Sequence, residues 1–155
     1  MKDSSYATRA ELALLGVEAG LARVVKLAVA RCKVDFQVIE GLRTIERQRD
    51  LIAQGWSKTL NSRHLTGDAV DLVPVIAGEI TWGNMAAFDA IAEAMFSAAD
   101  ELGHLIQSGS DRNLNSFNAN QTVVDRPHWQ NPYPFRIKDA GDAVAARNEQ
   151  KEAAK

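Results

Sequence analysis

The strongest constraint on the fold is a nearly continuous apolar run, residues 69–75, that contains one carboxylate, Asp71. A short apolar run of this kind is typical of a strand that is buried on both faces. Pro74 favours an edge or an exit point near the end of the strand. A carboxylate is costly to bury unless it is paired or binds a metal ion. The sequence therefore predicts a core strand and a partner for Asp71 from elsewhere in the chain.

The spacing of apolar residues predicts the elements around that run. Steps of three and four residues favour long amphipathic helices over 9–31 and 85–102, and a shorter polar helix is expected over 44–54. Further extended segments are expected at 34–39, 78–82, 105–107 and 122–124. The segments without periodicity are expected to be loops, 56–67 and 108–121.

The length of the chain, 155 residues, is sufficient for one domain with its own core, and neither a repeat nor a linker divides it. We expect a single small α+β domain over 1–155, with helices packed on a central antiparallel sheet. Its core is expected to span 9–138. The Ala-rich, charged end, 139–155, predicts a surface helix or tail that frays. Because such a core needs no second subunit, we expect a monomer.

The composition excludes several classes of protein. Eighteen Lys and Arg against 20 Asp and Glu give a net charge of -2, which argues against a nucleic-acid partner. Cys32 is the single cysteine, so no internal disulfide can form and a reducing compartment is expected. No apolar run approaches the roughly 18 residues of a membrane span, and the N-terminus lacks the apolar core of a signal peptide. We therefore expect synthesis in the cytoplasm and no membrane insertion.

Two short segments, 62–71 and 125–130, place side chains that can bind a metal beside apolar residues. His64 precedes Asp71 in the first segment, and Gly67 between them allows a turn that brings both side chains together. His128 in the second segment is the natural third ligand. Two imidazoles and one carboxylate, with a fourth position left for water, are typical of a catalytic zinc site.

Asp125 lies just before His128, and Pro127 between them favours a kink that brings both side chains into one cleft. A carboxylate beside the metal, but not bound to it, can take a proton from zinc-bound water. Each of these residues alone could be structural: a satisfied core carboxylate, a packing histidine or a turn residue. Their joint occurrence favours the metal site. His104 lacks such a pattern and is assigned to the end of a helix.

These motifs resemble those of a known family. The segment 62–71 reads Ser-x-His-x-x-Gly-x-Ala-x-Asp, which matches every fixed position in a signature of the zinc peptidases related to the vancomycin-resistance D,D-peptidases. The Asp-x-x-His of 125–128 resembles the second half of that signature. The segments 41–44, Arg47-Gln48 and 55–59 are similar to the bacteriophage endolysin branch, which contains L-alanyl-D-glutamate peptidases that cut the peptide stem of peptidoglycan. The resemblance covers most of the chain, from about residue 9 to residue 138.

The resemblance implies one zinc ion per chain, with three protein ligands: His64, Asp71 and His128. It implies that Asp125 is the general base. It also implies that Arg43 stabilises the developing oxyanion or holds a substrate carbonyl, and that Ser62 lies near the substrate or the metal. Two departures concern the substrate cleft. Many relatives carry glutamate in place of Asp125, and a Trp-Gly-Gly-Asp-Trp-like segment of the branch is replaced by Gln-Ser-Gly-Ser-Asp-Arg at 107–112.

The implied function is that of an endolysin, which hydrolyses the L-alanyl-D-glutamate bond of peptidoglycan and lyses the bacterium. It would be made in the host cytoplasm and reach the wall through a membrane pore. Two alternatives remain open. One is a D-alanyl-D-alanine carboxypeptidase or dipeptidase with the same metal site, and the other is a non-catalytic, zinc-containing module that binds the cell wall.

Overall fold

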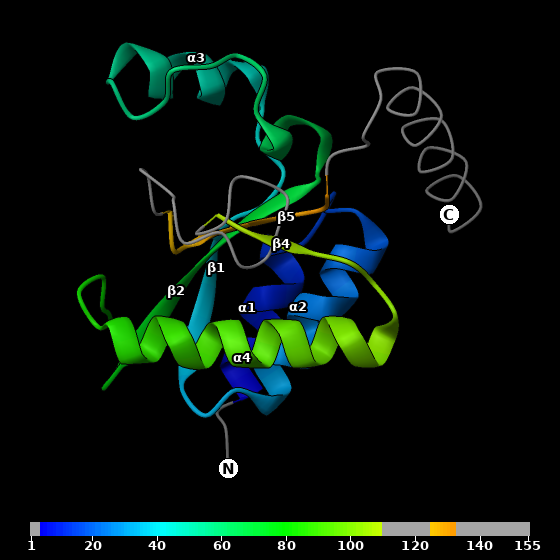
Figure 1. Ribbon diagram of the computed structural model, residues 1–155. Helices are drawn as coiled ribbons and strands as arrows, with labels where there is room; N and C mark the ends of the chain where they lie inside the picture. Colours follow the sequence, from blue (N-terminus) through cyan, green and yellow to red (C-terminus); the bar gives the residue numbers. More distant parts are fainter. Residues whose placement is uncertain (1–3, 110–124, 133–155) are drawn as a thin grey trace, which may run out of the picture.

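The computed structural model in Figure 1 describes residues 4–109 and 125–132. Its strands form an antiparallel sheet in the order β1-β2-β5-β4, and β3 pairs with β2 beside this path. The strands are β1 (Asp35–Glu40), β2 (Ala69–Ile76), β3 (Glu79–Ile80), β4 (Gln107–Ser108) and β5 (His128–Gln130). The helices are α1 (Ser4–Ala13), α2 (Ala19–Arg31), α3 (Ile45–Ala53) and α4 (Met85–Leu102), with a short 3-10 helix η1 (Arg63–Thr66). The predicted α+β arrangement of helices on an antiparallel sheet is confirmed.

The prediction of one continuous helix over 9–31 is wrong, because α1 and α2 are separate. Between them, Gly16 has a φ of 81°. This left-handed conformation favours glycine and interrupts the helical path of the backbone. Glu18 then begins α2 as its N-cap, and its carboxylate accepts hydrogen bonds from the backbone N–H groups of Gly20 and Leu21. The apolar residues Leu14 and Val17 still reach the core, but they do so from a turn rather than from a helix.

The other predicted elements occur close to their expected places. α4 coincides with the predicted helix, from the Asn84 cap to Gly103. The predicted strand at 105–107 is found as the short β4, and part of the predicted loop 56–67 forms η1. β2 continues through Pro74, which lies between the residues that pair with β5 and those that pair with β3. The extended segment expected at 122–124 and the tail 139–155 lie outside the described residues.

The core lies between the sheet and the helices α1, α2 and α4. Since side chains alternate across a strand, every second residue of β2 faces this core. Val70 and Leu72 belong to it, and their partners on the neighbouring strands, Trp129 and Val38, do so too. Phe96 of α4 meets the Trp129 ring edge-on, with 5.2 Å between the centroids. No helix in the described ranges has the length and apolar character needed to cross a membrane.

The same alternation points Asp71 to the other face of the sheet, away from α1, α2 and α4. Figure 1 shows α4 and α3 at opposite ends of the view, with the strands between them. Thr44 caps α3 and accepts a hydrogen bond from the backbone N–H of Arg47 at 3.1 Å. The fold thus packs Val70 and Leu72 against the helices on one side of β2, and on the other side it leaves Asp71 as the polar residue among the buried apolar residues Ala69, Val73 and Val75.

Candidate metal centre

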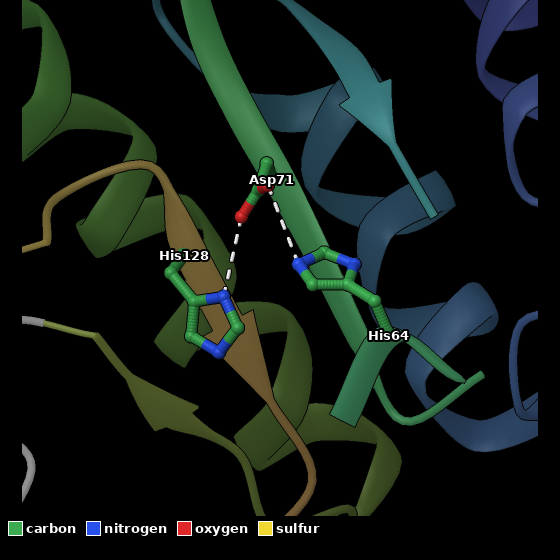
Figure 2. A group of neighbouring side chains, drawn as sticks. All are labelled: His64, Asp71 and His128. Atoms are coloured by element: carbon green, nitrogen blue, oxygen red, sulfur yellow. Dashed lines mark hydrogen bonds and ion pairs between the residues drawn. The ribbon is translucent and has the colours of Figure 1, made fainter. Parts of the chain in front are cut away.

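Three side chains from three different elements converge on the polar face of the sheet (Figure 2). Asp71 comes from β2, His128 from β5 and His64 from η1. His64 Nε2 lies 3.3 Å from one Asp71 carboxylate oxygen, and His128 Nδ1 lies 3.2 Å from the other. One potential ligand atom from each residue lies within 4.8 Å of the other two. The structure therefore brings together all three residues predicted to bind the metal.

Local structure explains this convergence. Asp71 and His128 are direct partners in the β2–β5 ladder, so their side chains project from the same face. His64 is positioned by η1, whose N-cap Ser62 accepts a hydrogen bond from the His64 backbone N–H at 3.2 Å. Gly67 ends η1 with a φ of 76°, and a Cβ there would collide with the Gly16 carbonyl oxygen. The turn predicted at Gly67 is confirmed.

The two histidines present different ring nitrogens to Asp71. A carbonyl oxygen can only accept a hydrogen bond, so we assign His64 Nδ1 as the donor to the Gly41 carbonyl at 2.8 Å. In His128 the Nε2 atom donates to the Gln130 side-chain oxygen at 2.9 Å. These outer contacts leave His64 Nε2 and His128 Nδ1 as the ring atoms that face Asp71. Each can donate to the carboxylate when it is protonated and can bind a cation when it is not. Contacts of this type fix the ring orientation and tautomer of metal-binding histidines.

The electrostatics of the centre favour a negative carboxylate beside a positive group. Burial raises the pKa of Asp71, but the hydrogen bonds and charges of His128 and His64 outweigh it, and the net pKa lies well below its usual range. Burial lowers the pKa of His128, but the hydrogen bond and charge of Asp71, with smaller contributions from Gln130 and Asp125, raise it overall. The site thus stabilises positive charge next to Asp71, as expected of a cation site.

Arg43 lies at the edge of this centre, with its Nη2 atom 3.7 Å from an Asp71 carboxylate oxygen. Its Nε atom donates to Glu40 at 2.7 Å, and its Nη1 atom donates to Gln48 at 2.7 Å and to Ser62 Oγ at 3.4 Å. These contacts hold the guanidinium in one orientation. Arg43 and Ser62, both singled out in the sequence, therefore adjoin the three converging side chains.

Gln48 is a residue that the sequence motifs alone did not single out as functional. It lies in α3 and is completely buried. Its oxygen accepts from Arg43, and its nitrogen donates to Ser57 Oγ at 2.9 Å and to the Thr59 carbonyl at 2.6 Å. The resemblance to the endolysin branch includes this position but assigns it no role, and its contacts with the loops on both sides of α3 are seen only in the structure.

Asp125 occupies the turn that leads into β5. Its carbonyl accepts a hydrogen bond from the His128 backbone N–H at 3.2 Å, and its own N–H donates to the Gly109 carbonyl at 3.3 Å. The Gly109 N–H in turn donates to the His128 carbonyl at 2.6 Å. Asp125 is half-buried, and its negative charge is close enough to raise the pKa of His128. The structure therefore places a carboxylate near the centre but outside the group of three.

The donor set fits a catalytic zinc ion. Zinc in hydrolases is commonly held by imidazole nitrogens and a carboxylate oxygen, with one position left for water or substrate. Here one nitrogen of each of two oriented imidazole rings faces the same carboxylate. The chemistry that such an arrangement supports is the activation of water and the polarisation of a carbonyl group.

Comparison with known proteins gives consistent similarities. The family model of the phage L-alanyl-D-glutamate peptidases matches residues 4–130. The chain is 34% identical over 111 residues to the L-alanyl-D-glutamate peptidase of Escherichia phage T5, an alignment that covers 70% of this chain and 81% of that protein. The crystal structure of the L-Ala D-Glu endopeptidase ChiX of Serratia marcescens is similar with a TM-score of 0.72 and 39% sequence identity. That similarity covers 82% of this chain and 89% of ChiX.

Proposed function

The chain belongs to the family of phage L-alanyl-D-glutamate peptidases, and on this basis we propose that it hydrolyses the bond between L-alanine and D-glutamate in the peptide stem of peptidoglycan. The observation that carries the proposal is the convergence of His64, Asp71 and His128 on the polar face of the sheet. A metallopeptidase needs such a group of ligands close to a charged residue that can stabilise the transition state.

One zinc ion per chain is the proposed cofactor. His64 would hold it through Nε2, His128 through Nδ1 and Asp71 through its carboxylate, because these are the atoms that face one another. When bound, zinc lowers the pKa of a coordinated water and polarises the carbonyl of the scissile bond. Gly41 and Gln130 keep the two rings in the orientation that this role requires.

Asp125 is the proposed general base. It accepts a proton from the attacking water and passes it to the amine of D-glutamate as the peptide bond breaks. Its backbone hydrogen bond to His128 ties the two residues to one turn, which supports a fixed distance between base and metal centre. The shorter aspartate side chain, in place of the glutamate of many relatives, requires the water to lie closer to this turn.

Arg43 is proposed to stabilise the negative charge that develops on the carbonyl oxygen. Its side chain is only 9% exposed, and Glu40 and Gln48 hold it from two sides. A donor that is already oriented needs no reorganisation when the charge forms, and this is why such groups contribute strongly to catalysis. Ser62, which caps η1 and also touches Arg43, is proposed to lie beside the bound substrate.

The biological setting is part of the same proposal. Peptidoglycan stem peptides are the proposed partner, and a single domain over 1–155 is proposed to act on them as a monomer. Family membership supports a role in lysis, in which the enzyme reaches the wall through a membrane pore. A molar mass measured by light scattering tests the monomer.

Mass spectrometry of digested peptidoglycan tests the activity itself. The proposed endopeptidase creates a new N-terminal D-glutamate on the stem peptide. A D-alanyl-D-alanine carboxypeptidase would release D-alanine instead, and a wall-binding module would bind the wall without releasing any product. Either of these results would contradict the proposed function.

A further inference from the structure

A second group of polar side chains lies buried outside the metal centre: Glu18, Asp68, His104 and Asn131, here called the carboxylate clamp. Asp68 is completely buried, and Glu18 and Asn131 are almost so. Two buried carboxylates are costly unless hydrogen bonds and neighbouring charges compensate them. The burial of Glu18 and Asp68 must therefore be compensated, and the contacts within the clamp provide this compensation.

Asn131 is the centre of the clamp. Its Nδ2 group donates to Glu18 Oε2 at 3.0 Å and to Asp68 Oδ1 at 3.0 Å. Its side-chain oxygen accepts from His104 Nε2 at 2.7 Å. The two N–H donors and the oxygen acceptor of one amide thus form hydrogen bonds with three different parts of the chain. Its backbone N–H also donates to the Asp68 carbonyl at 2.9 Å.

Each carboxylate of the clamp is attached to a defined segment. Glu18 caps α2 through the N–H groups of Gly20 and Leu21, and its own N–H donates to the Gly67 carbonyl at 2.8 Å. Asp68 accepts a further hydrogen bond from the hydroxyl of Thr66 at 2.5 Å. The clamp therefore joins the start of α2 to the turn between η1 and β2.

His104 attaches the end of α4 to the same group. Its backbone N–H donates to the Ala99 carbonyl at 3.0 Å, as expected for a residue that completes a helix end. Its ring also lies against Gly20, where a Cβ would overlap it, and its Nε2 is 3.6 Å from Glu18 Oε2. The assignment of His104 to a helix end is therefore incomplete, since its side chain belongs to the clamp.

The clamp lies beside both segments that carry the metal-binding side chains. Asp68 follows the turn between His64 and Asp71, and Asn131 follows the strand that carries His128. The ladder between β2 and β5 is short, with register pairs only from Ala69–Gln130 to Asp71–His128. Backbone hydrogen bonds from Leu72 to the Pro127 carbonyl and from Asn131 to the Asp68 carbonyl extend this pairing at its two ends. The Asn131 side chain adds the attachment of this junction to Glu18 at the start of α2.

We propose that Asn131 is a positioning residue for the metal centre: by binding Glu18 and Asp68 with one amide, it fixes the His64–Asp71 turn against the strand of His128. This inference rests on the proposed zinc site. It assigns Asn131 no contact with metal or substrate. Its effect is on how closely the three ligands approach the geometry that zinc requires, and therefore on zinc affinity and on kcat.

The test is the zinc dissociation constant of Asn131→Ala, measured by competition with a chelator and compared with the wild-type protein. Loss of the shared donor should weaken zinc binding by about tenfold, as for other residues that orient metal ligands. The kcat should fall while KM changes little, because the substrate contacts remain. Ile91→Ala is the control. It opens a cavity in the core face of α4, more than three helical turns before His104, and should lower the melting temperature without changing zinc affinity.

A second, milder variant can be measured if Asn131→Ala does not fold. Thr66→Val removes only the hydroxyl that binds Asp68, at an exposed position, and should weaken zinc binding by about threefold. Zinc affinity that is unchanged in the folded variants, or reduced equally in Ile91→Ala, would overturn the inference. If the wild-type protein itself binds no zinc, the proposed function fails instead, and the two failures are distinguished.

Discussion

The two faces of β2 differ at Asp71, although both carry buried apolar residues and alternate along one strand. Val70 and Leu72 are completely buried against the helices, whereas Asp71 between them meets His64 and His128 on the other face. The apolar face stabilises the fold through burial, which is insensitive to small changes of direction. The polar face depends on distances and orientations of individual atoms. Substitutions on the core face should therefore lower the stability of the fold. Substitutions around Asp71 should impair zinc binding and catalysis.

The largest loss of function is expected for His64→Ala. Removal of one of three ligands should abolish stoichiometric zinc binding, and with it all measurable hydrolysis of purified cell walls. The metal-free proteins, wild-type and variant, should have similar far-UV circular dichroism. Elemental analysis after gel filtration measures the bound zinc. A His64→Ala protein that keeps one zinc per chain would refute the role of this residue as a ligand.

Asp125→Asn should separate catalysis from metal binding. The amide cannot accept the proton, so kcat should fall by about 100-fold or more, while zinc content and melting temperature remain as in the wild-type protein. Asp89→Asn, an exposed carboxylate that pairs with Arg126, serves as control and should stay active. Undiminished lysis by the Asp125→Asn enzyme would exclude this residue as the base.

Arg43→Lys tests the oriented guanidinium. A lysine keeps the charge but cannot make the forked contacts with Glu40 and Gln48. We expect kcat to fall by about 100-fold, with zinc affinity changed much less. Arg47→Lys, a more exposed change of the same type, should have little effect. Equal rates for both variants would show that Arg43 acts only in the structure.

Leu72→Ala probes the apolar face directly beside Asp71. The cavity should lower the free energy of unfolding by about 2–5 kcal/mol, measured by chemical denaturation. The folded fraction should still bind zinc and retain its kcat, because Leu72 points away from the metal centre. A large loss of zinc affinity in the folded protein would show that the two faces are coupled more strongly than their contacts indicate.

The smallest effect is expected for Glu18→Gln, and it depends on pH. Burial raises the pKa of Glu18, but hydrogen bonds from Gly20, Leu21 and Asn131 and the charge of His104 lower it overall. A carboxylate with a lowered pKa in the folded state stabilises the fold above its unfolded pKa, and this contribution is lost as pH falls through the folded pKa. The variant should therefore lose less stability than the wild-type protein between about pH 5 and pH 3. Glu101→Gln, an exposed partner of Arg31, should leave the acid profile unchanged.

The sequence predicts the parts of this molecule that depend on local patterns. The spacing of apolar residues identifies α4, the apolar run identifies β2, and Gly67 marks the turn between two of the converging residues. The break between α1 and α2 is not predicted in this way, because Leu14, Val17 and Leu21 keep helical spacing across a turn. Periodicity reports which residues face the core, and it does not report whether the backbone between them is continuous.

The contacts of buried amides are the second part that the sequence does not reveal. Gln48 and Asn131 are both buried and bind charged groups. The partners of Gln48 lie in the loops on both sides of α3, and those of Asn131 lie in distant parts of the chain, so apolar periodicity encodes neither contact. The convergence of His64, Asp71 and His128 is predictable because the chemistry of a metal site restricts the residue types and because a signature joins them.

The most direct test of the central claim is a crystal structure of the protein with added zinc, with anomalous diffraction recorded at the zinc absorption edge. We predict one anomalous peak per chain, bound by His64 Nε2, a carboxylate oxygen of Asp71 and His128 Nδ1. A peak at another place, or these three side chains pointing away from one another in the crystal, would contradict the account.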